Sequence, residues 1–217
     1  MTTIGFSALL KLICLNAQPQ MSALRSRYSG STGGYDYHRS LRQYAHRLLV
    51  DREPLADLVS AAQAIARDSE RRSVINGLEW LAAWRDANPG AIFHVPSVTF
   101  ESPSSVFRVQ YEPNFGIEIN GSRVAVHIFN TANPPLVARL VYSALRMMRP
   151  EYEDVFPIDD IAVLSIPDRS LYRLSEAPAL AAPDRLVPSL ERLLEDAQDQ
   201  ATGNRPIQVP PRGPTPL

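Results

Sequence analysis

The dipeptide Asn120-Gly121 constrains the fold of this chain more than any other feature, because it fixes the register of a β-hairpin. It lies in the stretch EPNFGIEINGSRVAVHIFNT (residues 112–131), between two runs of alternating apolar residues. A type I′ turn needs positive φ at both central residues, and Asn-Gly is a pair that favours it. A two-residue turn at this point predicts that Asn114 lies opposite His127.

Alternation then places the side chains of the hairpin on two faces. One face is apolar and is expected to belong to the core: Phe115, Ile117, Ile119, Val124, Val126 and Ile128. The other face is mixed, with polar groups at one end and an ion pair expected near the turn: Glu112, Asn114, Gly116, Glu118, Arg123, Ala125, His127 and Phe129. This mixed face is the candidate functional face.

Helical patterns precede the hairpin. Apolar residues at helical spacing predict helices over residues 41–50, 54–66 and 69–87, and Asn88-Pro89-Gly90 ends the third. The period then changes to two. Strands are expected over residues 93–100 and 106–111, and the Ser- and Pro-rich residues between them predict a hairpin turn.

A helix and a buried strand follow the hairpin. Asn133 is a good N-cap before two prolines, so a helix is expected to begin there and to run to about Met148. Residues 161–166 are an unbroken apolar run, which predicts a central strand covered on both faces. A short partner strand over 171–174 and an amphipathic helix over 187–197 complete the pattern.

Both ends of the chain are expected to be flexible. The sequence predicts a flexible N-terminal segment over residues 1–40, a single α+β domain over 41–199 and a disordered Pro-rich tail over 200–217. Neither end shows a pattern that buries much apolar area. Deleting residues 1–20 together with 201–217 is therefore expected to leave the melting temperature nearly unchanged.

The first residues also raise the question of a targeting segment. The apolar run Ile4–Leu15 is too short to span a bilayer and lacks the features of a signal peptide. Residues 1–20 are interpreted as an upstream start-site extension or a disordered tail, with a targeting segment as the alternative. Whether Met1 or Met21 is the true start stays open.

Composition excludes several kinds of function. The 217 residues carry a formal net charge of −1, so binding to nucleic acid would need a local basic patch. The single cysteine, Cys14, excludes a disulfide framework and a cysteine-rich zinc site. It also fits a reducing compartment, and a cytoplasmic location is expected. Lys11 is the single lysine, which leaves the rest of the chain without a lysine for nuclease chemistry.

The order of these elements, and residues 112–131 in particular, resembles the PD-(D/E)XK (restriction-endonuclease-like) superfamily. The resemblance covers roughly residues 70–175 and implies an α-β-β-β-α-β core: N-terminal helices, an antiparallel strand meander, a helix and a central strand. In that superfamily the motif carboxylates hold Mg²⁺ and the lysine steadies the attacking water. A metal-assisted phosphodiester cut requires such an anionic cage.

This sequence departs from the motif at each reacting position. Pro113 keeps the proline, but Asn114 stands where the resemblance places the aspartate. His127 stands at the glutamate position and Phe129 at the lysine position. An amide, an imidazole and a phenyl ring do not make a Mg²⁺ site, because a hard cation selects anionic oxygens. The histidines also lack paired metal-ligand spacing, so neither a metal nor another cofactor is expected.

Several residues remain as candidates. If the protein is active, the candidate face consists of Glu79, Asn114, Glu118 and His127. His127 beside Asn114 could act as a general base, or the two could form a cross-strand pair of structural purpose. A nucleic-acid backbone could contact the cations Arg139, Arg146 and Arg149, for which a solvated face is the alternative.

The expected function is therefore a non-catalytic binding or regulatory domain, a pseudoenzyme with a nuclease-like core. Its partner is expected to be an unknown protein or a nucleic acid, with no membrane association. The alternative is an atypical metal-dependent nuclease or another hydrolase that uses Glu79, Glu118 and His127.

Overall fold

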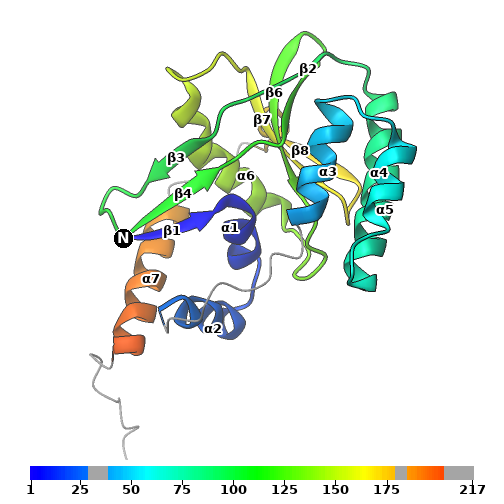
Figure 1. Cartoon of the computed structure of the whole chain (residues 1–217). Helices are drawn as coiled ribbons and strands as arrows, with labels where there is room; N and C mark the ends of the chain where they lie inside the picture. Colours follow the sequence, from blue (N-terminus) through cyan, green and yellow to red (C-terminus); the bar gives the residue numbers. More distant parts are fainter. Residues whose placement is uncertain (29–38, 179–184, 203–217) are drawn as a thin grey trace, which may run out of the picture.

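The strands divide into two sheets, which helices cover (Figure 1). The computed structural model describes residues 1–28, 39–178 and 185–202, and it has the α+β class that the sequence predicts. The strands are β1 (Thr2–Gly5), β2 (Ile92–Phe93), β3 (Val98–Glu101), β4 (Phe107–Tyr111), β5 (Phe115–Ile119), β6 (Ser122–Phe129), β7 (Asp160–Ser165) and β8 (Ser170–Arg173). The larger sheet has the order β2-β5-β6-β7-β8, and the smaller one has the order β1-β4-β3.

Helices make up most of the remaining described chain. The α-helices are α1 (Phe6–Ile13), α2 (Ala17–Tyr28), α3 (Arg39–Leu49), α4 (Leu55–Ala62), α5 (Asp68–Ala87), α6 (Ala138–Met148) and α7 (Leu186–Thr202). Short 3-10 helices are η1 (Arg149–Tyr152) and η2 (Leu174–Glu176). The sequence patterns thus predict most of the ends of α3, α4, α5 and α7 to within a few residues.

The β5–β6 hairpin has the register that Asn120-Gly121 predicts. Both turn residues have positive φ, 52° and 77°. Glu118 is paired with Arg123, and Phe115 with Val126, in an antiparallel ladder. The register prediction is confirmed, and it fixes which face of the sheet each side chain of the hairpin meets.

The contacts of the Arg123 side chain differ from those that strand alternation predicts. The sequence predicts an ion pair near the turn, since Glu118 lies opposite this arginine. The Arg123 guanidinium instead lies over two aromatic rings, 4.6 Å from the centroid of Phe93 and 5.0 Å from that of Phe156. Aromatic faces attract a guanidinium through the ring quadrupole. These rings come from β2 and from the chain before β7, far from the hairpin in sequence.

The predicted central strand is β7, which pairs with β6 in parallel and with β8 antiparallel. All six of its residues are buried, as an unbroken apolar run predicts. Helix α6 forms the crossover between the two parallel strands. It begins at Ala138 rather than at Asn133. The two prolines explain the delay, because a residue that precedes proline is disfavoured in the helical region.

Each face of the larger sheet has its own apolar core. On one face, α3, α4 and α5 pack against Phe115, Ile117, Val124, Val126 and Ile128, as predicted. On the other face, α1, α6 and α7 pack together with the smaller sheet against Ala125, Phe129, Ile161 and Val163. Figure 1 shows α3, α4 and α5 on one side of the large sheet and β1, α1, α2 and α7 on the other. The part of the mixed face formed by Ala125, His127 and Phe129 is therefore covered, whereas Glu112 and Glu118 are exposed.

The expected flexible segment over residues 1–40 is wrong for its first 28 residues. β1 pairs in parallel with β4, from Thr2 opposite Phe107 to Gly5 opposite Gln110. Helix α1 follows at once and is buried along one side: Phe6, Leu9, Leu10, Leu12 and Ile13. The apolar run that is too short for a bilayer is thus a core helix. Deleting residues 1–20 would remove it, so the melting temperature is expected to fall rather than to stay nearly unchanged. Residues 29–38 lie outside the described part of the chain.

The expected meander is divided between the sheets. β3 and β4 form the predicted hairpin, but β4 continues pairing with β1 instead of β5. β5 pairs with the two-residue strand β2, which stands at the sheet edge. At the other end of the chain, α7 runs to Thr202, so it includes the first residues of the expected tail. Residues 203–217 of that tail lie outside the described residues.

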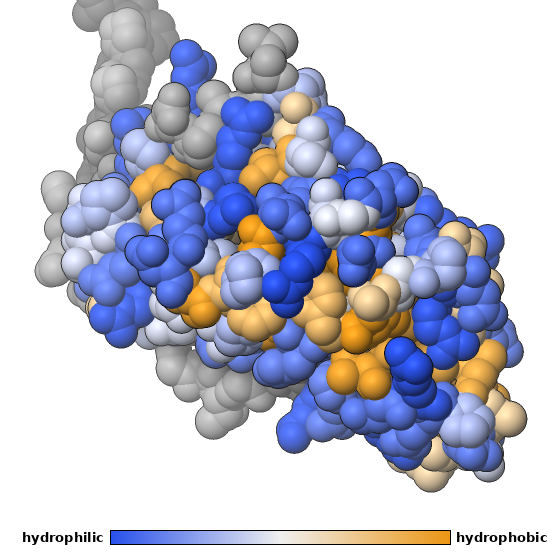
Figure 2. Space-filling view, turned by 90° about the horizontal axis from the view of Figure 1, so that it is seen from above, coloured by the Kyte–Doolittle hydropathy of each residue, from blue (hydrophilic) through white to orange (hydrophobic). Residues whose placement is uncertain are grey.

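Figure 2 shows one face of the molecule, on which hydrophilic residues predominate and apolar residues lie in separate patches between them. Scattered apolar surface of this kind is ordinary for a globular protein. In the part of the chain that the structure describes, no helix combines the length and the apolar character that crossing a membrane requires.

The N-terminal core yields a stability prediction. Leu10 is fully buried, so Leu10→Ala is expected to lower the free energy of unfolding by about 2–5 kcal/mol, through lost burial and a cavity. Val155→Ala is the control, because Val155 is 56% exposed, and little change is expected. Urea unfolding of both variants measures the difference. Equal stability of the two would mean that α1 does not contribute to the core.

Candidate functional site

The end of the β5–β6 hairpin carries the first two residues of the site. Asn114 directly precedes β5, and its backbone N–H donates to the Val126 carbonyl over 2.8 Å. Its side-chain Oδ1 accepts a hydrogen bond of 2.7 Å from the backbone N–H of Ile128. The amide thus extends the strand ladder by one bond and lies beside His127. The side-chain oxygen of Asn114 therefore already has a hydrogen-bond donor.

His127 is held at both ring nitrogens. Nδ1 lies 2.9 Å from the backbone carbonyl oxygen of Glu112, and Nε2 lies 2.7 Å from Oγ of Ser7. A carbonyl oxygen can only accept, so Nδ1 must carry the proton. In the neutral ring Nε2 is then the acceptor, and the Ser7 hydroxyl donates to it. The network selects one tautomer.

Burial keeps this imidazole uncharged at neutral pH. His127 is 5% exposed and packs near the rings of Phe6 and Tyr111, at centroid distances of 5.3 and 5.7 Å. Burial lowers the pKa of His127 to about 4; the Glu112 carbonyl opposes this shift, and the charge of Arg42 adds to it. The cause is the lost hydration of the imidazolium ion.

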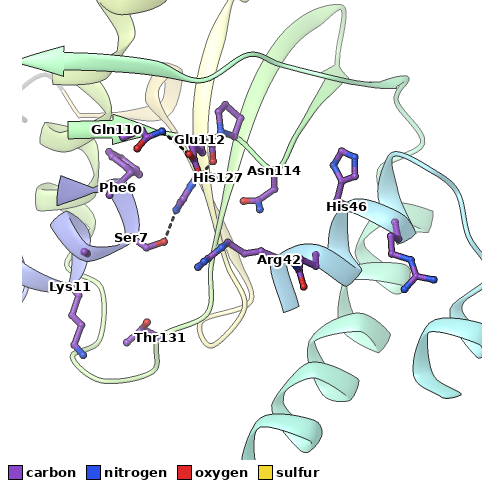
Figure 3. Close-up of a pocket in the computed structure, with 15 residues that line it drawn as sticks. Phe6, Ser7, Lys11, Arg42, His46, Gln110, Glu112, Asn114, His127 and Thr131 are labelled. Carbon is purple, nitrogen blue, oxygen red and sulfur yellow. Dashed lines mark hydrogen bonds between the residues drawn. The ribbon is translucent and has the colours of Figure 1, made fainter. Parts of the chain in front are cut away.

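A pocket of about 920 Å³ opens beside this pair (Figure 3). Its walls come from β1 and α1, from α3, from the chain between β4 and β5, and from the end of β6. The polar side chains that line it are Ser7, Lys11, Arg42, Gln43, His46, Arg47, Gln110, Glu112, Asn114, His127 and Thr131. The start of α1 also faces the pocket, and no side chain caps that helix. Its first backbone N–H groups have no partners within the helix.

The charges around the pocket are unequal. Arg47 forms a two-pronged ion pair with Glu53, at 2.6 and 2.7 Å, which satisfies both groups. Figure 3 shows Arg42 reaching from α3 toward Ser7, while Lys11 projects from α1 on the other side of Ser7. Among the described residues that line the pocket, Glu112 carries the single carboxylate, and Gln110 donates to it over 2.7 Å. Among the described residues that line the pocket, cationic side chains therefore outnumber carboxylates.

The structure brings some of the predicted site residues together and separates others. Asn114 and His127 lie side by side in the pocket, as the hairpin register predicts. Glu79 is exposed on α5, and Glu118 is exposed toward the other end of β5, and neither lines the pocket. The face proposed from these four residues does not form as one site.

The predicted arginine face is also divided. Arg139 lines a different pocket of about 540 Å³, between α6 and α7. Arg149 donates to the Ile158 carbonyl over 3.0 Å, which ties down the chain before β7. Arg146 is half-buried on α6. None of these three arginines lines the pocket around His127.

Sequence reasoning did not find Ser7, Lys11 and Arg42 as site residues. The first two lie in the segment for which the sequence predicts flexibility, and Arg42 lies on a helix without a recognisable motif. One available signal is the run of apolar residues at helical spacing after Gly5, which is long enough for a core helix although too short for a membrane span. The partner of that helix is 120 residues away, at His127.

Within the described residues, no group of three or more His, Cys, Asp or Glu side chains is placed to hold a metal ion. No protein-family model matches the chain. No curated protein matches it either. A solved structure described as "Crystal structure of SSO0001" is similar to it, with 14% sequence identity over 82% of each chain and a TM-score of 0.32. That degree of likeness carries no argument about fold or function.

The low pKa of His127 gives a pH prediction. In the unfolded chain an ordinary histidine takes up its proton near pH 6.5, whereas the folded protein takes it up only near pH 4. The stability from this difference is fully present above pH 6.5 and is lost as the pH falls toward 4. The loss between pH 7 and pH 5 is expected to be about 2 kcal/mol.

Urea unfolding at pH 7 and pH 5 measures this loss. His127→Gln should reduce the difference between the two pH values. The matched control is His94→Gln, since His94 is exposed, and it should keep the full difference. An unchanged pH dependence in the His127 variant would contradict the assignment.

Proposed function

We propose that the protein is a binding domain for nucleic acid, with an element order that resembles a nuclease and without metal-dependent cleavage. The observation that carries the proposal is the cationic pocket around Lys11 and Arg42. It stands beside Asn114 and His127, the positions that the resemblance assigns to metal ligands. Backbone phosphate is the ligand group that such a pocket fits.

The chemistry of the pocket supports an anionic ligand. Lys11 and Arg42 supply positive charge from two different elements, so a group between them meets both. The uncapped start of α1 adds backbone N–H donors and the positive end of the helix dipole. Neutral His127 and the half-buried Asn114 add no negative charge. Phosphate contacts of this kind bind nucleic acid without reading its sequence.

The same residues argue against a magnesium site. Mg²⁺ prefers carboxylate oxygens and water in octahedral geometry. The pocket offers one lining carboxylate, that of Glu112, while Asn114 Oδ1 is bound to the backbone of Ile128. A metal ion would also lie close to Arg42, which repels it. Phosphate is therefore the better match for this pocket than a cation.

The first test is cleavage. We expect no Mg²⁺-dependent cleavage of single- or double-stranded DNA or RNA above a mock preparation, because all three reacting positions of the motif are replaced. Labelled oligonucleotides with Mg²⁺ or EDTA, resolved on denaturing gels, measure this. Robust cleavage that EDTA and His127→Ala both abolish would instead support the atypical nuclease.

A gain-of-site variant complements that test. The triple change Asn114→Asp, His127→Glu, Phe129→Lys is expected to raise Mg²⁺ affinity and to lower stability. Phe129 is fully buried in the core, and a lysine there would bury an unpaired charge. Thermal melting with and without Mg²⁺ measures both effects. No ion-dependent stabilisation in the folded variant would count against the resemblance.

The second test is binding, by fluorescence anisotropy with labelled single-stranded and duplex oligonucleotides. The double variant Lys11→Gln, Arg42→Gln is expected to weaken binding for all sequences alike and to reduce the salt slope by about 2. The matched control is Arg139→Gln, Arg146→Gln on α6, which removes the same charge outside the pocket. Equal weakening by both variants would point to unspecific attraction, and no binding by the wild type would overturn the proposal.

A further inference from the structure

Ser7 occupies a position that the fold fixes from two sides. It is the second residue of α1, which starts directly after β1, and the ladder between β1 and β4 holds the chain up to Gly5, two residues before it. Its side chain is half-buried and lines the pocket of about 920 Å³. A hydroxyl in this place is held firmly and still faces a space large enough for a small molecule.

The hydrogen bonds of Ser7 and His127 are those of a nucleophile and its base. Oγ lies 2.7 Å from Nε2, and Nδ1 donates its proton to the Glu112 carbonyl over 2.9 Å. The carbonyl fixes the tautomer and the ring orientation, which leaves Nε2 free to take the serine proton. A hydroxyl, a base and a group that orients the base are the three parts of an activated nucleophile.

The surroundings favour a reaction at Ser7. The rings of Phe6 and Tyr111 pack near the imidazole and exclude water from it. Phe6, Ser7 and Ala8, in the first turn of α1, line the same pocket. The first N–H groups of a helix have no partners within it, so they can stabilise negative charge that develops on a carbonyl oxygen. Arg42 and Lys11 can attract an anionic group on another part of the substrate.

We propose that Ser7 is a covalent nucleophile, with His127 as its general base, toward carboxylic esters that carry a negatively charged group and a good leaving group. This goes beyond the binding proposed above and does not need nucleic acid as the ligand. The pocket supplies the nucleophile, the base, the oxyanion donors and the cations for the charged group.

The reaction runs in two balanced steps. Ser7 Oγ attacks the ester carbonyl carbon while its proton moves to Nε2 of His127; the carbon–oxygen bond to the leaving group then breaks, and the leaving group takes up the proton. Water next attacks the acyl-serine, His127 again takes and returns the proton, and the carboxylic acid and free Ser7 result. Water is the single co-reactant. A good leaving group is needed because an imidazole held uncharged by burial is a weak base.

The experiment uses the mono-anionic ester mono-4-nitrophenyl adipate as the probe and the neutral ester 4-nitrophenyl butyrate for comparison. Intact-mass spectrometry should find one acyl adduct per chain, which peptide mapping places on Ser7, with faster formation from the anionic ester. Ser7→Ala should form no adduct. Ser26→Ala is the matched control, since Ser26 is exposed on α2, and it should react like the wild type.

The pH dependence of adduct formation distinguishes a base from a structural histidine. With His127 as the base, the rate should be nearly constant from pH 6 to pH 8, because its pKa is about 4. An ordinary histidine would give a rise centred near pH 6.5, and attack by hydroxide would give a rise of about tenfold per pH unit. Either rise would overturn the role of His127.

The remaining outcomes are also decisive. The inference is overturned if a preparation with a normal melting curve shows neither an adduct on Ser7 nor 4-nitrophenol release beyond that of Ser7→Ala. An adduct that survives Ser7→Ala also overturns it. Arg42→Gln should remove the preference for the anionic ester without removing the adduct. Oligonucleotide binding is measured on the same wild-type preparation, so a failure of acylation and a failure of nucleic-acid binding are seen separately.

Discussion

The pairing of β1 with β4 is the constraint on which the rest of the site depends. Four residues of main-chain ladder hold the start of the chain against the smaller sheet, and α1 follows without a loop. The apolar side of α1 then covers the face of the larger sheet that carries His127. Without this ladder, Ser7 would not reach a residue 120 positions away, and the pocket would lack one wall.

Covering that face creates the electrostatic character of the site. A polar ring enters an apolar core at acceptable cost only when its nitrogens are hydrogen-bonded. His127 meets this condition at both nitrogens, and within the described chain no buried side-chain nitrogen or oxygen lacks a partner. Burial in turn keeps the ring neutral. The positive charge of the pocket therefore comes from side chains around the imidazole rather than from the imidazole itself.

Asn114 and His127 both make hydrogen bonds that hold the structure together. The amide of Asn114 extends the ladder of the hairpin, and His127 joins the hairpin to α1. Hydrogen bonds to the backbone and to Ser7 thus hold the two side chains at adjacent strand ends. This is why the two proposals concern phosphate and a serine nucleophile: each relies on neutral donors and nearby cations rather than on a cage of carboxylates.

The sequence alone determined the local elements. Asn120-Gly121 fixed the hairpin register because positive φ at both turn positions suits few residue pairs. The run at residues 161–166 identified β7 because a strand covered on both faces must be apolar throughout. Tertiary structure alone decided the role of the first residues, since Thr2–Gly5 forms a strand through hydrogen bonds to β4 that leave no periodic pattern. It also decided the site, because Ser7, Arg42 and His127 meet through packing between distant segments, which spacing along the chain does not encode.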